Sequence, residues 1–121
     1  MKDVISNICS MARNFYKDGS KSIIQLFQES GYLDLTEHVT KEKLMEYLAT
    51  HPDLVHDWEI YSSGKRYSPA WYFMQFESDW VVGYSSTPSQ ERKQVYSSGV
   101  EACAEFILHE LWELTELVSH D

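Results

Sequence analysis

Basic residues are scarce in this chain of 121 residues. It has 10 lysines and arginines against 19 aspartates and glutamates, which gives a formal net charge of −9 with histidine neutral. A nucleic-acid-binding protein needs a lysine and arginine footprint to neutralise phosphates, and anionic membranes attract polybasic segments. We therefore expect no nucleic-acid partner and no membrane partner. The same charge would attract a cationic protein over a long range.

Cysteines and long apolar runs are scarce as well. Cys9 and Cys103 lie in apolar periodic segments, and we interpret them as buried thiols in a reducing cytosol, with a bridge between them left open by the sequence. No apolar stretch approaches the roughly 18 residues of a membrane span. Lys2 is followed at once by Asp3 rather than by the apolar run of a secretion signal. We expect a cytoplasmic location.

Three local enzyme motifs are missing. The sequence contains no C-x-x-C, no Gly-rich phosphate loop and no G-x-S-x-G. We therefore assign no catalytic residues, no cofactor and no metal, and predict that the protein is not an enzyme. The composition is 43% apolar and 14% aromatic, which is enough for one core in a single domain spanning 1–121.

Apolar residues in the first third recur with helical spacing. Val4–Phe15 forms one stripe at i, i+3 and i+4, which predicts a first helix. The pattern resumes over Ile23–Phe27 and stops at Gly31. Thr40 has the position of the N-cap of a third helix, which Pro52 closes.

The middle third changes to a period of two and is rich in aromatic and β-branched residues. This pattern predicts strands near 56–62, 66–76 and 80–85. The connectors are short and polar, which favours antiparallel pairing, and Pro69 is expected at an edge or a bulge. Residues 92–97 are a candidate for a fourth strand.

The last third is predicted to be one long helix. Ser98 and Glu101 match a capping box at its start. Apolar residues at helical spacing trace a buried stripe along it. They are Val100, Cys103, Ile107, Leu111, Leu114 and Val118. The predicted fold is therefore α+β, with N-terminal helices, a central antiparallel meander sheet of three or four strands, and a long C-terminal helix packed on the sheet.

This C-terminal segment has an unusual charge pattern. From residue 94 onward there is no lysine or arginine, whereas six acidic residues occur. Like charges four residues apart repel, and acids near a helix C-terminus oppose the helix dipole. Such a pattern, without evident compensation, is either the solvated face of an acidic helix or a surface for a partner. The partner-binding residues predicted on this helix are Glu101, Glu105, His109, Trp112, Glu113 and Glu116.

Three further acids complete the predicted partner-binding set. Asp57, Glu59 and Asp79 are expected at strand ends. Both faces of the predicted strands carry apolar residues, so one face packs on helices and the other is either covered too or exposed as an aromatic anchor. Trp71 is expected in the core.

His109 and Glu113 lie one helical turn apart in the run HELWE. The run resembles the zincin motif H-E-x-x-H with the second histidine replaced by glutamate. That replacement removes a ligand that the motif needs, so we interpret His109 as part of the surface. The acids around it are expected to raise its pKa and to make it a pH-sensitive element.

In outline the chain resembles the immunity proteins of bacterial polymorphic toxin systems, in particular those of contact-dependent growth inhibition. The resemblance spans the chain and is carried by the runs WEIY, KRY, AWYF, VVGY and VEACAEFI at 58–61, 65–67, 70–73, 81–84 and 100–107. It implies binding to the C-terminal toxin domain of a cognate effector, often a basic nuclease, as a monomer or weak homodimer. Such proteins have no catalytic residues to carry over.

Two other functions remain open at this point. The chain could be a non-catalytic adaptor or a subunit of a larger assembly. It could also be a small ligand-binding domain or an enzyme that uses a pocket under the aromatic sheet.

Overall fold

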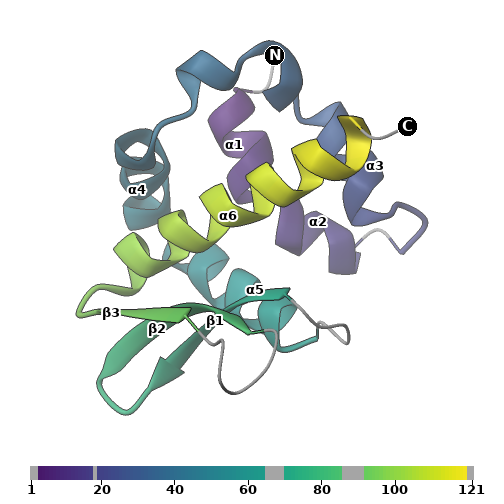
Figure 1. Ribbon diagram of the computed structural model, residues 1–121. Helices are drawn as coiled ribbons and strands as arrows, with labels where there is room; N and C mark the ends of the chain where they lie inside the picture. The colour runs from purple at the N-terminus through teal and green to yellow at the C-terminus, as the bar shows by residue number, and fades with distance from the viewer. Residues whose placement is uncertain (1–2, 18, 65–69, 86–91, 120–121) are drawn as a thin grey trace.

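The computed structural model describes residues 3–17, 19–64, 70–85 and 92–119. Within these residues the fold is α+β, with short helices first, then a three-stranded antiparallel sheet, then one long helix. The long helix lies between the sheet and the N-terminal helices (Figure 1). The predicted fold class is confirmed.

The first predicted helix is two helices. α1 (Val4–Cys9) and α2 (Met11–Lys17) are separated at Ser10, whose backbone leaves the helical region. α1 buries its apolar side chains, with Ile8 and Cys9 fully inaccessible, and α2 buries Met11 and Ala12. The apolar stripe is therefore continuous across the break even though the helix is not.

A left-handed residue ends the next helix, α3 (Ile23–Glu29). Gly31 follows with a φ of 89°, a conformation that glycine adopts without the strain of a side chain. Two 3-10 turns, η1 (Tyr32–Asp34) and η2 (Thr36–His38), then carry the chain to α4. The predicted stop signal is confirmed.

The start of α4 (Lys41–Thr50) has the predicted cap. The Thr40 hydroxyl accepts a hydrogen bond of 3.2 Å from the backbone N–H of Lys43. This bond satisfies one of the amides that every helix N-terminus leaves without an intrahelical partner.

The prediction of a strand near 56–62 is wrong, because this segment lies inside α5 (Pro52–Ser63). Pro52 occupies the first turn, where a missing N–H costs nothing. The buried residues of α5 are Leu54, Val55, Trp58, Tyr61 and Ser62. Their spacing is helical, although aromatic and β-branched composition suggested a strand. The predicted strand residues 66–69, with Pro69, lie outside the described residues.

The sheet has the order β1-β2-β3 and is antiparallel throughout. Its strands are β1 (Ala70–Phe76), β2 (Asp79–Ser85) and β3 (Arg92–Tyr96). β3 confirms the candidate strand near 92–97. Phe73 pairs with Val82, and both side chains are buried in the core that the sheet shares with the helices.

α5 covers the outer edge of β1. The backbone N–H of Phe73 donates to the Ser62 hydroxyl over 2.7 Å, and that of Gln75 donates to the Glu59 carboxylate over 3.3 Å. Side chains of a helix thus satisfy backbone groups that an edge strand would otherwise expose.

α6 (Gly99–Ser119) is the longest of the described helices and packs against both the sheet and α4. Ser98 caps it by accepting from the backbone N–H of Glu101 over 3.2 Å. Of the predicted stripe, Cys103, Ile107 and Leu111 are almost fully buried. None of the described helices is long and apolar enough to cross a membrane.

Candidate functional site

One band of α6, partly exposed at its start and exposed at its end, collects most of the predicted partner-binding residues. We call it the α6 strip, and it consists of Glu101, Glu105, His109, Trp112 and Glu116. Successive members are three or four residues apart, so they lie on the same side of the helix. The opposite side of α6 holds the buried stripe.

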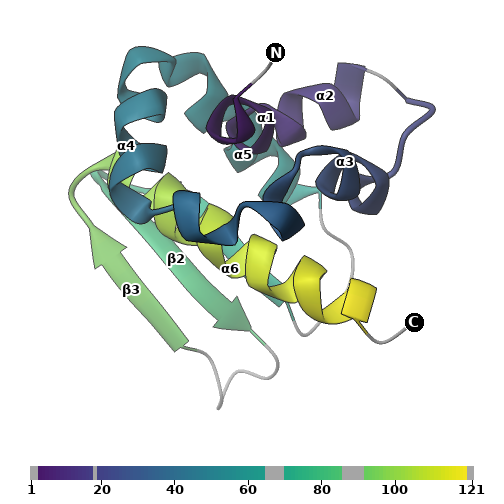
Figure 2. The same cartoon turned by 90° about the horizontal axis from the view of Figure 1, so that it is seen from above.

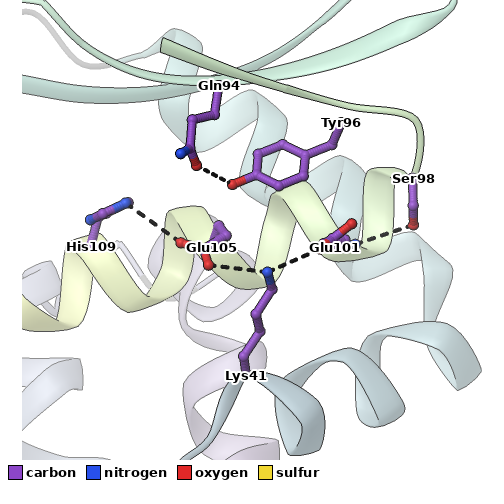
Figure 3. Close-up of polar contacts among 7 residues, drawn as sticks. All are labelled: Lys41, Gln94, Tyr96, Ser98, Glu101, Glu105 and His109. Carbon is purple, nitrogen blue, oxygen red and sulfur yellow. Dashed lines mark hydrogen bonds and ion pairs between the residues drawn. The ribbon is translucent and has the colours of Figure 1, made fainter. Parts of the chain in front are cut away.

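The N-terminal part of the α6 strip is partly neutralised by a lysine from another helix. The Lys41 ammonium on α4 lies 3.0 Å from a carboxylate oxygen of Glu101 and 3.1 Å from one of Glu105 (Figure 3). The expectation that nothing compensates the acidic row is therefore wrong at these two positions. The compensation is 60 residues away in sequence from Glu101.

Lys41 is held charged by these contacts. Its pKa is raised mainly by the hydrogen bond to Glu101, and burial opposes this, while the hydrogen bond and charge of Glu105 add to the increase. The same ammonium lies 5.6 Å from the centre of the Tyr96 ring, within range of a cation–π contact. The Tyr96 hydroxyl donates to Gln94 Oε1 over 2.6 Å. The network therefore joins α4, α6 and β3.

The His109 ring stacks on Trp71. The two ring centroids are 3.5 Å apart, and the planes are within 5° of parallel. His109 Nε2 lies 3.6 Å from Glu105. Burial lowers the pKa of His109, and the nearby carboxylate of Glu105 offsets this only in part. The prediction of a raised pKa is therefore wrong, because desolvation against Trp71 outweighs the attraction of the acid.

This stack also corrects the placement of Trp71. The side chain is half-buried, packed against the core from its margin, and tilted against Tyr84 at 5.1 Å between centroids. Trp71 thus joins the sheet to the α6 strip.

A cleft opens beside the stack. It has a volume of about 530 Å³ and is lined by residues of all three strands and of α6. Its lining combines an aromatic wall, an aliphatic floor and four polar or charged side chains. They are Trp71, Val82, Lys93, Gln94, Glu105 and His109.

The C-terminal part of the α6 strip is open to solvent. Trp112 is 63% exposed, which is unusual for a tryptophan, and Glu116 is also exposed. Glu113 is half-buried and turns toward a second cleft, which it lines with Glu110 and Leu117. The structure therefore separates Glu113 from the other predicted residues of this helix.

The other three predicted acids lie elsewhere. Asp57 and Glu59 are on α5, so the expectation that they mark strand ends is wrong. Asp57 pairs with Arg13 of α2 at 2.7 Å, and Glu59 accepts the backbone N–H of Gln75. Asp79 does begin a strand and is exposed beside the β1–β2 turn.

The two cysteines lie in the core, apart from the α6 strip. No group of three or more metal-ligating side chains occurs among the described residues. Cys9 and Cys103 are free and buried. Burial, helped by Asp3, raises the pKa of Cys9 to about 12, and burial also raises the pKa of Cys103. Neutral, inaccessible thiols are poor nucleophiles and ligands.

The sequence-based prediction missed Lys41 and Gln94. Nothing local to α4 or β3 indicated that these side chains would meet α6. Comparison of the chain with protein-family models, with curated proteins and with solved structures gave no match.

Proposed function

We propose that this protein is an immunity protein that acts in the cytoplasm by binding a cognate, basic toxin domain through the C-terminal part of the α6 strip. The observation that carries the proposal is Trp112, a large aromatic side chain 63% exposed on a helix that has no lysine or arginine. Exposed tryptophans at the centre of a charged surface are frequent anchors of protein interfaces.

Charge supports the same partner. Each molecule carries a net charge of −9, and the exposed Glu116 follows Trp112 one turn along the helix. Complementary charge mainly accelerates association and selects the partner, whereas a desolvated aromatic anchor slows dissociation. For a nuclease toxin, carboxylates would occupy the place of substrate phosphates. The protein would then act by occlusion, with no catalysis of its own.

The experiment is capture of the partner from the native host, followed by growth rescue on co-expression of the captured polypeptide. Trp112→Ser removes the anchor, and Glu116→Lys reverses a charge beside it. Glu46→Lys is the matched control, because Glu46 is also exposed but lies on the side of α4 away from Lys41. Thermal melts of all three variants establish that each folds.

The proposal expects one basic polypeptide to bind, more slowly as salt rises, and to arrest growth unless the wild-type protein is present. Trp112→Ser should lose both capture and rescue, and Glu46→Lys should keep both. Absence of any toxic cationic partner, or full rescue by Trp112→Ser, would refute the proposal.

A second candidate function is supported by the cleft beside Trp71. Its volume of about 530 Å³ and its mixture of aromatic and polar walls are typical of small-molecule sites. This candidate predicts a bound metabolite in native mass spectra of the purified protein. Gln94→Leu should remove it, whereas Trp112→Ser should not.

A further inference from the structure

β3 is the outer strand of the sheet, and its free edge has no cover among the described residues. Figure 2 shows β3 at the margin of the molecule, with β2 on one side and no described element on the other. The opposite edge, at β1, is covered by Ser62 and Glu59 of α5. Helix α5 therefore covers the β1 edge of the sheet, whereas no described element covers the β3 edge.

The pairing pattern determines which backbone groups β3 presents. The N–H of Phe73 points away from β2, toward α5. In an antiparallel sheet the N–H and C=O of one residue point the same way, and successive residues alternate. Phe73 pairs with Val82, and Val82 pairs with Gln94. The backbone groups of Val82 therefore point toward β3, and those of Gln94 point toward β2. Those of Lys93 and Val95 point outward.

We propose that a second copy of this chain pairs antiparallel with this edge, with Gln94 of each copy facing the other across a twofold axis. In that register Lys93 of the first copy lies opposite Val95 of the second, and Val95 of the first lies opposite Lys93 of the second. Both residues present their backbone N–H and C=O outward, so the four outward groups of each edge form four hydrogen bonds in all. The pairing joins two three-stranded sheets into one of six strands.

Side chains in this register favour a second copy. At the centre of this register no like charges lie directly opposite each other, because Lys93 of each copy faces Val95 of the other. The aliphatic stem of Lys93 would cover Val95, which is 58% exposed. The outer face of the same sheet also exposes Met74 by 42% and Phe76 by 59%, so the two apolar faces become one continuous surface.

Overall charge opposes the contact. Two copies at −9 each repel, and lysine on an edge strand is a common device that weakens edge pairing. The self-association is therefore weak and becomes stronger as salt screens the repulsion. This salt dependence is opposite to that expected for a basic toxin, so the two contacts can be told apart.

The test is disulfide trapping with single cysteines on β3, supported by sedimentation across a concentration series at low and high salt. Gln94→Cys places two thiols in a pair without ladder hydrogen bonds, with Cα atoms about 4.5 Å apart, inside the range for a disulfide. Val95→Cys is the matched control, because position 95 faces position 93 of the second copy. Cys9 and Cys103 are buried and do not interfere.

Val95→Pro supplies the complementary variant. The N–H that proline removes at position 95 points away from β2, so the bonds between β2 and β3 remain. The paired edges lose two hydrogen bonds, one from each copy. A thermal melt checks that the fold persists. We expect wild-type dimer at high concentration and high salt, monomer for Val95→Pro, and about tenfold more cross-linked dimer for Gln94→Cys than for Val95→Cys.

Three results would overturn the proposal. They are a wild-type protein that stays monomeric throughout the series, a dimer that survives Val95→Pro, and equal cross-linking at positions 94 and 95. Loss of toxin capture in Val95→Pro with no change in oligomeric state would assign the edge to the toxin instead. The first three outcomes depend on neither Trp112 nor a toxin, so the self-association can fail while the proposed function stands, and the reverse.

Discussion

Replacing Lys41 with methionine should lower stability and accelerate association with a basic partner at the same time. The ammonium joins α4 to Glu101 and Glu105 at 3.0 Å and 3.1 Å. Methionine keeps the length of the stem but removes the charge. The two carboxylates, four residues apart on α6, then repel without compensation.

The magnitude follows from the exposure of the partners. The side chains of Lys41, Glu101 and Glu105 are 27%, 39% and 24% exposed, so water screens both pairs in part. Pairs of this kind are worth about 0.2–1 kcal/mol each, which predicts a loss of about 0.5–2 kcal/mol in the free energy of unfolding. For a chain of this length that is a fall in Tm of about 2–8 °C.

The assay is thermal unfolding of a double-mutant cycle made of Lys41→Met, Glu105→Gln and both together, at low salt and in 1 M salt. Coupling between the two positions should be favourable at low salt and smaller at high salt. Glu46→Lys serves again as a charge change outside the network. Additive effects of the two substitutions, or no change in Tm for Lys41→Met, would refute the claim that this network joins the two helices.

Three further predictions test other parts of the structure, each by thermal or urea unfolding. Trp58→Phe removes the buried hydrogen bond of 2.9 Å to the Cys9 carbonyl and should cost about 1–3 kcal/mol; a melt like wild type would show that the bond is dispensable. Gly83→Val drives a side chain into the overlying Tyr72 ring and should cost about 1–3 kcal/mol, whereas Gly19→Ala, with nothing near its added carbon, should be almost neutral. In the folded protein His109 has a pKa below its ordinary 6.5, so as the pH falls the unfolded chain takes up the proton before the folded chain does. Stability therefore falls as the pH drops from above 6.5 toward the pKa of the folded state. His109→Gln should therefore lose less stability than wild type between pH 7.5 and 5, and an equal loss in both proteins would contradict the buried-histidine account.

Much of the fold follows from local signals in the sequence. Thr40 and Ser98 have the cap positions that the structure confirms, and both predictions rest on bonds within four residues. The two-residue period of the side chains predicted the strand that is β2, because the two faces of this strand pack against different parts of the protein. The C-terminal helix was evident from its apolar stripe.

The error at α5 has an identifiable cause. Trp58 and Tyr61 suggested a strand by composition, but they lie three residues apart on a face that also holds Leu54. Spacing and the proline at position 52 were the signals for a helix, and both were given less weight than β propensity. Propensity for strands mainly reflects packing on a half-buried surface, which a buried helix face also provides.

The site was less predictable because its decisive contacts join distant segments. Lys41 reaches Glu101 across 60 residues, and Trp71 desolvates His109 from the sheet. The pattern of α6 alone therefore predicts a bare acidic row and a raised pKa for His109, whereas the folded protein has a partly neutralised row and a lowered pKa. Trp112 was correctly singled out as a surface residue, because helical spacing places it away from the buried stripe.

The most direct measurement of the central claim is the affinity of the captured toxin domain for the wild-type protein, Trp112→Ser and Glu46→Lys. All three are compared at one salt concentration, with folding checked by thermal melts. If the α6 strip binds the toxin through its aromatic anchor, Trp112→Ser weakens binding by about tenfold or more, while Glu46→Lys stays close to wild type. Equal affinity of Trp112→Ser and wild type would contradict the account.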